Sequence, residues 1–122
     1  KALSEGSYTC FLKEDTKLPM MFMDDAIRAT LQIMQAPAHK IKERSSYNLA
    51  AMSFTPKEMA ENIKAVIPEF KIGYEPDFRQ VIADSWPSSI DDSKAQKDWK
   101  WKAEFDLQKT TETMLENLKN RV

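Results

Sequence analysis

The sequence predicts an α/β lobe with a small, partly parallel sheet and about four helices, forming one unit over residues 1–122. Segments of strand character alternate with segments of helical periodicity, and a helix between two strands is typical of a parallel crossover connection. The strands are few and short, which is typical of part of a larger α/β protein. The chain begins with Lys1 rather than methionine, so we expect it to start inside a longer protein.

The first third is expected to form a strand and then a helix. Tyr8–Leu12 has strand composition, and an extended apolar segment at 19–22 follows a polar turn. Asp24 or Asp25 then stands where a helix N-cap is expected. The helix is predicted by apolar residues at helical spacing, namely Ile27, Leu31 and Met34. Pro37 ends it.

The central third repeats this order. Tyr47–Ala51 is interpreted as a second strand. Residues 55–58, Thr-Pro-Lys-Glu, form a capping box with proline at the first helical position. The helix that follows is predicted to end at Pro68 and carries an apolar stripe of Met59, Ile63, Val66 and Ile67. Phe70–Tyr74 alternates like a half-buried strand.

The last third is mostly helical. Residues 75–87 are interpreted as helix, loop or both. A short helix is expected to open at 90–93, with an aspartate or serine cap, and to reach Trp99. Asp106 is expected to cap the last helix, whose apolar stripe is Leu107, Met114, Leu115 and Leu118.

Composition excludes several classes of partner. The net charge is −1, from 18 basic and 19 acidic residues, which gives no electrostatic reason to expect nucleic acid or an anionic membrane. No apolar run approaches the roughly 18 residues that a membrane span needs. The only cysteine, Cys10, rules out an internal disulfide and suits a reducing compartment. Two glycines, Gly6 and Gly73, cannot form a dinucleotide fingerprint or a P-loop.

Few residues suggest chemistry. The only histidine, His39, lies in a charged loop and is expected at the surface, so we expect no metal site. Cys10 is expected to be a buried structural thiol. The pairs at 24–25 and 91–92 resemble acid pairs, but each precedes a helix and capping is the preferred interpretation.

Methionines and aromatics form the remaining candidates. The run at 20–23, Met-Met-Phe-Met, is expected to be core rather than a pocket lining. Trp99 and Trp101 are expected to be packing anchors near a helix end. Trp86 lies in an irregular stretch, so a binding site and a core position are equally favoured by the residues alone.

Three segments together resemble a known family. Residues 18–29, LPMMFMDDAIRA, are similar to the late strand-to-helix passage of extended short-chain dehydrogenases, and 47–56 resemble their next strand and capped helix. Residues 77–87, DFRQVIADSWP, with the Asp-Asp-Ser-Lys-Ala helix at 91–95, complete the pattern. The first and third segments resemble the short-chain-type L-threonine 3-dehydrogenases. The resemblance covers nearly the whole chain, and Asp-Ser-Trp-Pro is its most specific piece.

The resemblance implies a fold, a reaction and a cofactor. The chain would be the C-terminal substrate-binding lobe of an extended Rossmann-type enzyme that oxidises the 3-hydroxyl of L-threonine with NAD to 2-amino-3-oxobutyrate. The cofactor loop and the Tyr-x-x-x-Lys catalytic pair would lie upstream, so the chain alone is expected to be inactive. The parent is expected to be a homodimer formed through its nucleotide-binding half. A cytoplasmic location is expected, with the mitochondrial matrix as the alternative.

The catalytic pair of the family is absent from the sequence. The residues four positions after Tyr8, Tyr47 and Tyr74 are not lysine; they are Leu12, Ala51 and Phe78. No catalytic or cofactor-binding residue is therefore assigned to this chain.

Two substrate-binding residues are carried over from the resemblance. Trp86 matches the tryptophan that closes over the substrate, where it would exclude water and orient the amino acid. Arg79 lies near the same passage, and a structural salt bridge is its equal alternative. One departure is Lys100, which stands where the family commonly has glycine and would cost roughly 1 kcal/mol in a left-handed conformation.

Two other functions stay open at this point. The chain would also fit the C-terminal lobe of a sugar-nucleotide epimerase or dehydratase, but such sites need cations for a diphosphate. The stretch from Glu75 to Trp86 has one arginine and no lysine, which argues against that alternative. A non-enzymatic interaction module would also lack the catalytic pair, and a compact core with a closed sheet would favour it.

Overall fold

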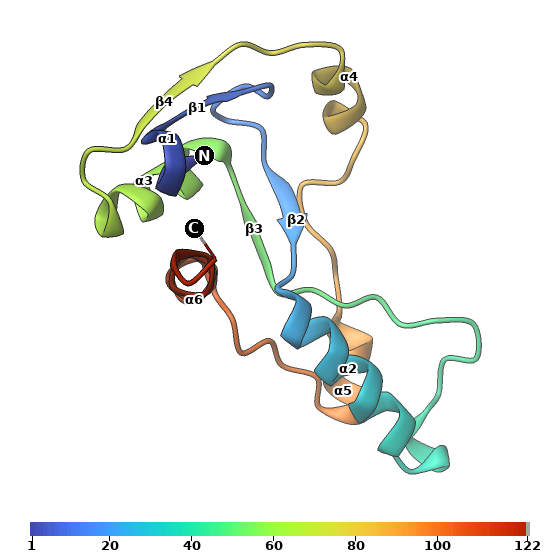
Figure 1. Cartoon of the computed structure of the whole chain (residues 1–122). Helices are drawn as coiled ribbons and strands as arrows, with labels where there is room; N and C mark the ends of the chain where they lie inside the picture. The colour runs from blue at the N-terminus through green and yellow to red at the C-terminus, as the bar shows by residue number, and fades with distance from the viewer. Residues whose placement is uncertain (122) are drawn as a thin grey trace.

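A computed structural model describes residues 1–121, and Figure 1 shows that they form an elongated molecule. The elements in chain order are α1 (Ala2–Glu5), β1 (Ser7–Cys10), β2 (Leu18–Met20), α2 (Met23–Gln35), the 3-10 turn η1 (Ala38–Lys40), β3 (Met52–Phe54), α3 (Pro56–Val66), β4 (Lys71–Tyr74), α4 (Arg79–Asp84), α5 (Ser93–Trp99) and α6 (Leu107–Lys119). β1, β4, α1 and α3 gather at one end of the molecule, and α2 and α5 lie at the other.

The strands pair in two separate two-stranded sheets. β1 lies parallel to β4, with Ser7 opposite Lys71, and β2 lies antiparallel to β3, with Leu18 opposite Phe54. The expected α/β class with partly parallel pairing is confirmed, as are the four longer helices. The expectation of three strands in one sheet is wrong, because the apolar approach to α2 forms a strand of its own.

The strand expected at Tyr47–Ala51 is also wrong, since strand pairing begins only at β3. Side chains satisfy the backbone of this extended segment instead of a neighbouring strand. The N–H of Ala50 donates to the Asp92 carboxylate at 3.2 Å, and the Ala50 carbonyl accepts from Nε1 of Trp101 at 3.1 Å. Strand composition is therefore present here without a strand partner within the described residues.

The main buried cluster lies between α2 and α5. Ala29 of α2 meets Ala95, Trp99 and Trp101, and the small alanines let the two helices approach the indole rings closely. The Tyr47 ring meets Trp99 edge to face, with the ring centroids 5.9 Å apart. The prediction that the two tryptophans are packing anchors is confirmed.

Local end signals of the helices match the sequence closely. The N–H of Thr55 donates to the Glu58 carboxylate at 2.8 Å, and the Glu58 N–H donates to the Thr55 hydroxyl at 3.2 Å, so the predicted capping box is present. The Asp106 carboxylate accepts from the Lys109 N–H at 2.8 Å and caps α6 as predicted. α6 packs against α3.

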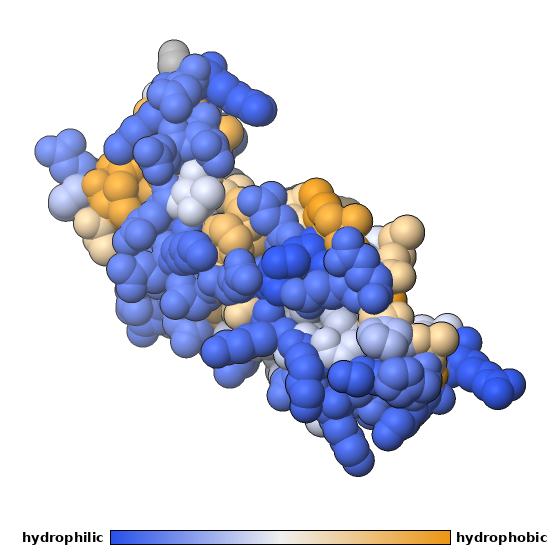
Figure 2. All heavy atoms as spheres, turned by 90° about the horizontal axis from the view of Figure 1, so that it is seen from below, coloured by the Kyte–Doolittle hydropathy of each residue, from blue (hydrophilic) through white to orange (hydrophobic). Residues whose placement is uncertain are grey.

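The apolar stripe of α2 faces outward. Its side chains are exposed at Met23 (67%), Ile27 (54%), Leu31 (52%) and Met34 (75%). Met20 is also 43% exposed, so the interpretation of the methionine run as core is wrong for Met20 and Met23. Seen from below, the surface is largely hydrophilic but is interrupted by separate hydrophobic patches (Figure 2). The helix is amphipathic as predicted, yet these four side chains remain mostly exposed within residues 1–121, while Ala29 on another side of the helix joins the buried cluster.

Lys100 adopts a left-handed conformation at the position where the resembled family commonly has glycine. It follows α5 with φ 63° and ψ 34°, which favour glycine because they crowd a Cβ atom. We expect Lys100→Gly to raise the free energy of unfolding by about 1 kcal/mol. Lys97→Gly, in the last turn of the same helix, should lower it by about 1 kcal/mol. Urea unfolding compares the two, and effects of the same sign would contradict this account.

The remaining surface expectations concern single residues and membrane contact. Cys10 is buried and free, and His39 is exposed on η1, as predicted. Across the described chain, no helix has the length and apolarity that crossing a membrane requires.

Candidate functional site

The segment that carries both predicted substrate residues is held at the end of β1. Beyond the paired strands, the N–H of Glu75 donates to the Cys10 carbonyl at 2.8 Å, and that of Asp77 donates to the Phe11 carbonyl at 3.2 Å. These bonds extend the β1–β4 pairing to the start of α4. Figure 1 shows α4 standing beyond the ends of the two strands.

The inner face of α4 is seated on the turn between β1 and β2. Gln80 and Ala83 are its buried residues. The Gln80 carbonyl oxygen accepts from the Lys13 N–H at 2.8 Å, while its amide nitrogen donates to the Thr16 hydroxyl at 2.9 Å and to the Asp84 carboxylate at 2.7 Å. Sequence reasoning missed Gln80, because a polar residue in an unassigned stretch gives no sign that it is buried.

The outer face of α4 is apolar and exposed. Phe78 and Val81 are each 74% exposed, and Ile82 is 51% exposed. Trp86 follows the helix end and is 57% exposed, and its backbone N–H donates to the Ala83 carbonyl at 3.1 Å. Exposed apolar side chains gathered on one element are typical of a surface that binds a ligand or another part of a protein.

Arg79 forms the salt bridge that the sequence analysis kept as an alternative. Its Nε and Nη2 atoms contact the Asp77 carboxylate at 3.0 Å and 2.6 Å, and its guanidinium lies 3.4 Å from the Phe11 ring centroid. Hydrogen bonding with Arg79 holds the pKa of Asp77 below its ordinary value and raises the pKa of Arg79. The guanidinium therefore lies over Phe11, with its charge offset by Asp77.

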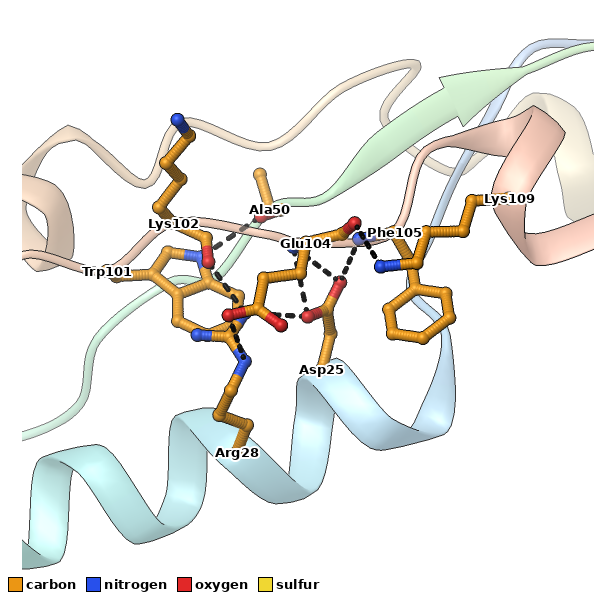
Figure 3. A network of polar contacts seen from close by, with 8 residues as sticks. All are labelled: Asp25, Arg28, Ala50, Trp101, Lys102, Glu104, Phe105 and Lys109. Atoms are coloured by element: carbon orange, nitrogen blue, oxygen red, sulfur yellow. Dashed lines mark hydrogen bonds and ion pairs between the residues drawn. The ribbon is translucent and has the colours of Figure 1, made fainter. Parts of the chain in front are cut away.

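A second polar cluster joins α2 to the chain segment before α6 (Figure 3). Asp25 is fully buried, and it accepts hydrogen bonds from Arg28 at 2.7 Å and from the N–H groups of Glu104 and Phe105 at 3.1 and 3.0 Å. Arg28 also donates to the Lys102 carbonyl at 2.7 Å. We call Asp25, Arg28 and the segment 102–105 the Asp25 clasp.

The clasp corrects the expectation that Asp24 or Asp25 caps α2. Phe22 occupies the N-cap position, and the Asp25 side chain instead points toward Glu104 and Phe105 (Figure 3). A sequence pattern cannot distinguish these cases, because the partners of Asp25 lie about 80 residues away. Asp25 is a structural residue: it is fully buried and its carboxylate is already hydrogen-bonded.

The charge of Asp25 is stabilised despite its burial. Burial alone would raise the pKa of the carboxyl. The Arg28 guanidinium and the N–H groups of Glu104 and Phe105 outweigh burial, and hold the pKa below its ordinary value. Ionised Asp25 therefore stabilises the folded protein.

This stabilisation should be lost in acid. An aspartate in the unfolded chain has a pKa of about 3.9. Because the folded pKa is lower, the contribution is complete above the unfolded value and disappears as pH falls through the folded value. The free energy of unfolding in urea should therefore decline below about pH 4, and less steeply in Asp25→Asn. An equal decline in both proteins would contradict this role.

The second aspartate pair is structural as well. Asp91 accepts from the Ser93 N–H at 2.9 Å, and Asp92 accepts from the Gln96 amide at 2.6 Å and from Ala50. Asp92 occupies the N-cap position of α5 but its side chain makes no capping bond, so the capping interpretation is wrong for Asp92. Neither pair forms an acid–base site.

Neither glycine of the chain stands where a dinucleotide-binding loop would need it. Gly6 lies between α1 and β1 with φ 65°, and Gly73 lies within β4, so neither opens a strand-to-helix loop. In the part of the chain that the structure describes, no group of three or more His, Cys, Asp or Glu side chains is arranged to hold a metal ion.

Comparison with known proteins adds curated relatives. L-threonine 3-dehydrogenase, mitochondrial, from Bos taurus is 51% identical over 116 residues, which cover 94% of this chain and 31% of the relative. An uncharacterized epimerase/dehydratase from Staphylococcus saprophyticus is 44% identical over 122 residues, covering 99% and 38%. The chain thus spans about a third of the length of the curated relatives it matches. No family model matches it.

Solved structures give the same result. L-threonine dehydrogenase from Phytophthora infestans matches with a TM-score of 0.96 and 50% identity, over 99% of this chain and 39% of that chain. The apo form of a GalE-like L-threonine dehydrogenase from Cupriavidus necator matches with a TM-score of 0.91 and 58% identity, over 96% and 43%. This chain resembles the C-terminal part of the L-threonine 3-dehydrogenases. The resemblance and fold class predicted from the sequence are confirmed.

The α4 segment is the candidate functional site. Among the described residues, α4 combines a buried polar side chain, Gln80, on its inner face with an exposed apolar outer face that ends at Trp86. The aspartate pairs, Cys10 and His39 have structural or surface positions that leave α4 as the candidate functional site.

Proposed function

We propose that this chain is the substrate-side lobe of an NAD-dependent L-threonine 3-dehydrogenase, which oxidises L-threonine to 2-amino-3-oxobutyrate. The proposal rests above all on the likeness over 99% of the chain to a solved L-threonine dehydrogenase, at 50% identity. The matched region, 99% of the chain, includes the α4 segment, and the likeness is one of sequence as well as of fold.

Trp86 is proposed to cover the substrate. Its large ring, 57% exposed at the end of α4, would exclude water from a small polar amino acid and orient it for the reaction. Arg79 is proposed as a supporting residue that holds the start of α4 on Phe11, because its guanidinium is paired with Asp77. Direct contact between Arg79 and substrate would require that pair to open.

NAD is proposed to bind to another part of the full-length protein. The two glycines of this chain do not provide a phosphate loop, and no tyrosine has lysine four positions later. The 122-residue chain alone is therefore proposed to be inactive. When bound, NAD would accept the hydride, and this lobe would bind and orient L-threonine.

The exposed stripe of α2 is proposed to dock against the nucleotide-binding part. Four apolar side chains, Met23, Ile27, Leu31 and Met34, are each more than half exposed. Burying such a stripe is favourable at about 25 cal/mol per Å² of apolar surface. A self-contained interaction module is less favoured, because the strands form two separate sheets rather than a closed one.

A sugar-nucleotide epimerase or dehydratase is the second candidate, since several relatives bear the general name epimerase/dehydratase. A diphosphate needs available cations. Between positions 75 and 86 the only cation is Arg79, and its guanidinium makes a 2.6 Å contact with Asp77. This pairing disfavours the second candidate.

Calorimetric titration of the full-length protein separates the candidates. With NADH present, so that the cofactor cannot accept a hydride from L-threonine, we expect L-threonine to bind and a UDP-sugar to give no heat, and Trp86→Ala to weaken threonine binding. Lys17→Ala, an exposed change outside α4, serves as the control. Binding of the UDP-sugar but not of L-threonine would overturn the proposal and favour the epimerase.

The assembly and compartment of the parent complete the proposal. We infer a homodimer formed through the nucleotide-binding half, which light scattering of the full-length protein tests directly. We infer a cytoplasmic location with the mitochondrial matrix as the alternative; the one free, buried cysteine, Cys10, suits either reducing compartment.

A further inference from the structure

Gln80 is the one largely buried polar side chain of α4, at 7% exposure. Its carbonyl oxygen faces the Lys13 N–H at 2.8 Å, and the Thr16 hydroxyl lies 2.9 Å from its nitrogen and 3.2 Å from its oxygen. Thr16 is itself buried, at 9% exposure. The side chain therefore joins α4 to a turn 64 to 67 residues earlier in the chain.

The contacts of Gln80 with Lys13, Thr16 and Asp84 suit a primary amide. The oxygen acts as an acceptor for a backbone N–H, while the nitrogen donates both to a hydroxyl and to the Asp84 carboxylate at 2.7 Å. Glutamate at this position would set a second carboxylate against Asp84 and would lose both donors. A leucine would leave the Lys13 N–H without its acceptor, at a site largely removed from water.

The same amide reaches the end of α4 from which Trp86 projects. Asp84 is the last residue of the helix. The backbone N–H of Trp86 donates to the carbonyl of Ala83, the residue before Asp84, at 3.1 Å. The outer side chains of α4 are exposed, so within residues 1–121 the inner seat sets the position of the helix end.

We propose that Gln80 is a positioning residue for Trp86, fixing where the indole lies over the substrate by tying α4 to Thr16 and Asp84. This inference rests on the proposed threonine dehydrogenase function. Gln80 contacts no substrate in this account; it acts through the helix that carries Trp86. Its loss should therefore raise the KM for L-threonine while the KM for NAD stays the same.

The test uses the full-length enzyme with Gln80→Glu, and with Gln80→Glu combined with Asp84→Asn. In the double variant the asparagine amide donates to the glutamate, so the bond between positions 80 and 84 is restored with its polarity reversed. Gln96→Glu is the matched control, because Gln96, an exposed residue of α5, makes the same bond to an aspartate four residues earlier, Asp92. We expect Gln80→Glu to raise the KM for L-threonine at least about tenfold, the double variant to recover most of it, and Gln96→Glu to match wild type.

A second readout does not depend on turnover. Acrylamide quenching of the fluorescence due to Trp86, obtained by subtracting a Trp86→Phe background, should increase in Gln80→Glu and return toward wild type in the double variant. No change in quenching, equal changes in the KM for both substrates, or a double variant no better than the single would overturn the role of Gln80. Wild-type enzyme that does not oxidise L-threonine would instead count against the proposed function, and quenching would still decide the role of Gln80.

Discussion

Replacing Asp25 with alanine is expected to destabilise the folded protein by about 3–5 kcal/mol, the range for breaking a buried ion pair by removing one partner. The variant would leave the Arg28 guanidinium, whose side chain is 25% exposed, without its carboxylate at 2.7 Å. It would also leave the N–H groups of Glu104 and Phe105 without their acceptor. The contacts of Arg28 with the Lys102 carbonyl and with Glu104 do not involve Asp25 and would remain. Urea unfolding of the full-length protein measures the loss.

The neighbouring aspartate provides the control. Asp24 is exposed on α2, so Asp24→Ala should change the free energy of unfolding by less than about 0.5 kcal/mol. Similar losses in the two variants would mean that helix capping or net charge, rather than the clasp, accounts for the effect. Such a result would restore the sequence-based interpretation of both residues.

Replacing Trp86 with alanine is expected to lower kcat/KM for L-threonine by roughly 100-fold, the size of effect that follows from misplacing reacting groups by about 1 Å. The indole would no longer cover the substrate, so water would enter and the amino acid would lose a fixed orientation. Because Trp86 is 57% exposed, stability should change by less than about 0.5 kcal/mol. Steady-state kinetics with NAD, alongside urea unfolding, measure both quantities.

Two further variants show whether the loss of kcat/KM depends on the ring of Trp86. Trp86→Phe retains a ring and should recover part of the activity. Lys17→Ala, an exposed change outside α4, should leave kcat/KM for L-threonine near the wild-type value. Wild-type kinetics in Trp86→Ala would remove Trp86 from the substrate site.

Local signals allowed most of the helices to be predicted. The capping box at Thr55 and Glu58, the cap at Asp106 and the break at Pro37 each act within a few residues, so their physics is present in the sequence itself. The left-handed conformation at Lys100 was indicated differently, by a family resemblance that expects glycine at this position. The intervening helices predicted partly parallel pairing, and β1 and β4 are the parallel pair.

Features that depend on distant partners were not accessible. Asp25 has the sequence context of a cap, and only the folded chain brings Glu104 and Phe105 to it. Tyr47–Ala51 has strand composition without a strand partner in the described residues. The stripe of α2 has the periodicity of a core face, and periodicity does not tell whether that face is covered.

The residues of the candidate site were likewise only partly indicated by the sequence. The sequence singled out Trp86 by its irregular surroundings and its resemblance, and Arg79 by its position nearby. It did not indicate Gln80, because burial of that amide depends on a turn more than 60 residues away. Nor did it distinguish the two interpretations of Arg79, since the nearby Asp77 allows a salt bridge but the sequence does not show that the side chains meet.

The most direct test of the central claim follows NADH absorbance after L-threonine and NAD are added to the full-length protein, with the 122-residue chain measured beside it. We predict threonine-dependent NADH formation by the full-length protein and none by the chain alone. Absence of NADH with the full-length protein, under conditions where it binds NAD, would contradict the threonine dehydrogenase assignment. NADH formation by the chain alone would contradict its role as a substrate-side lobe.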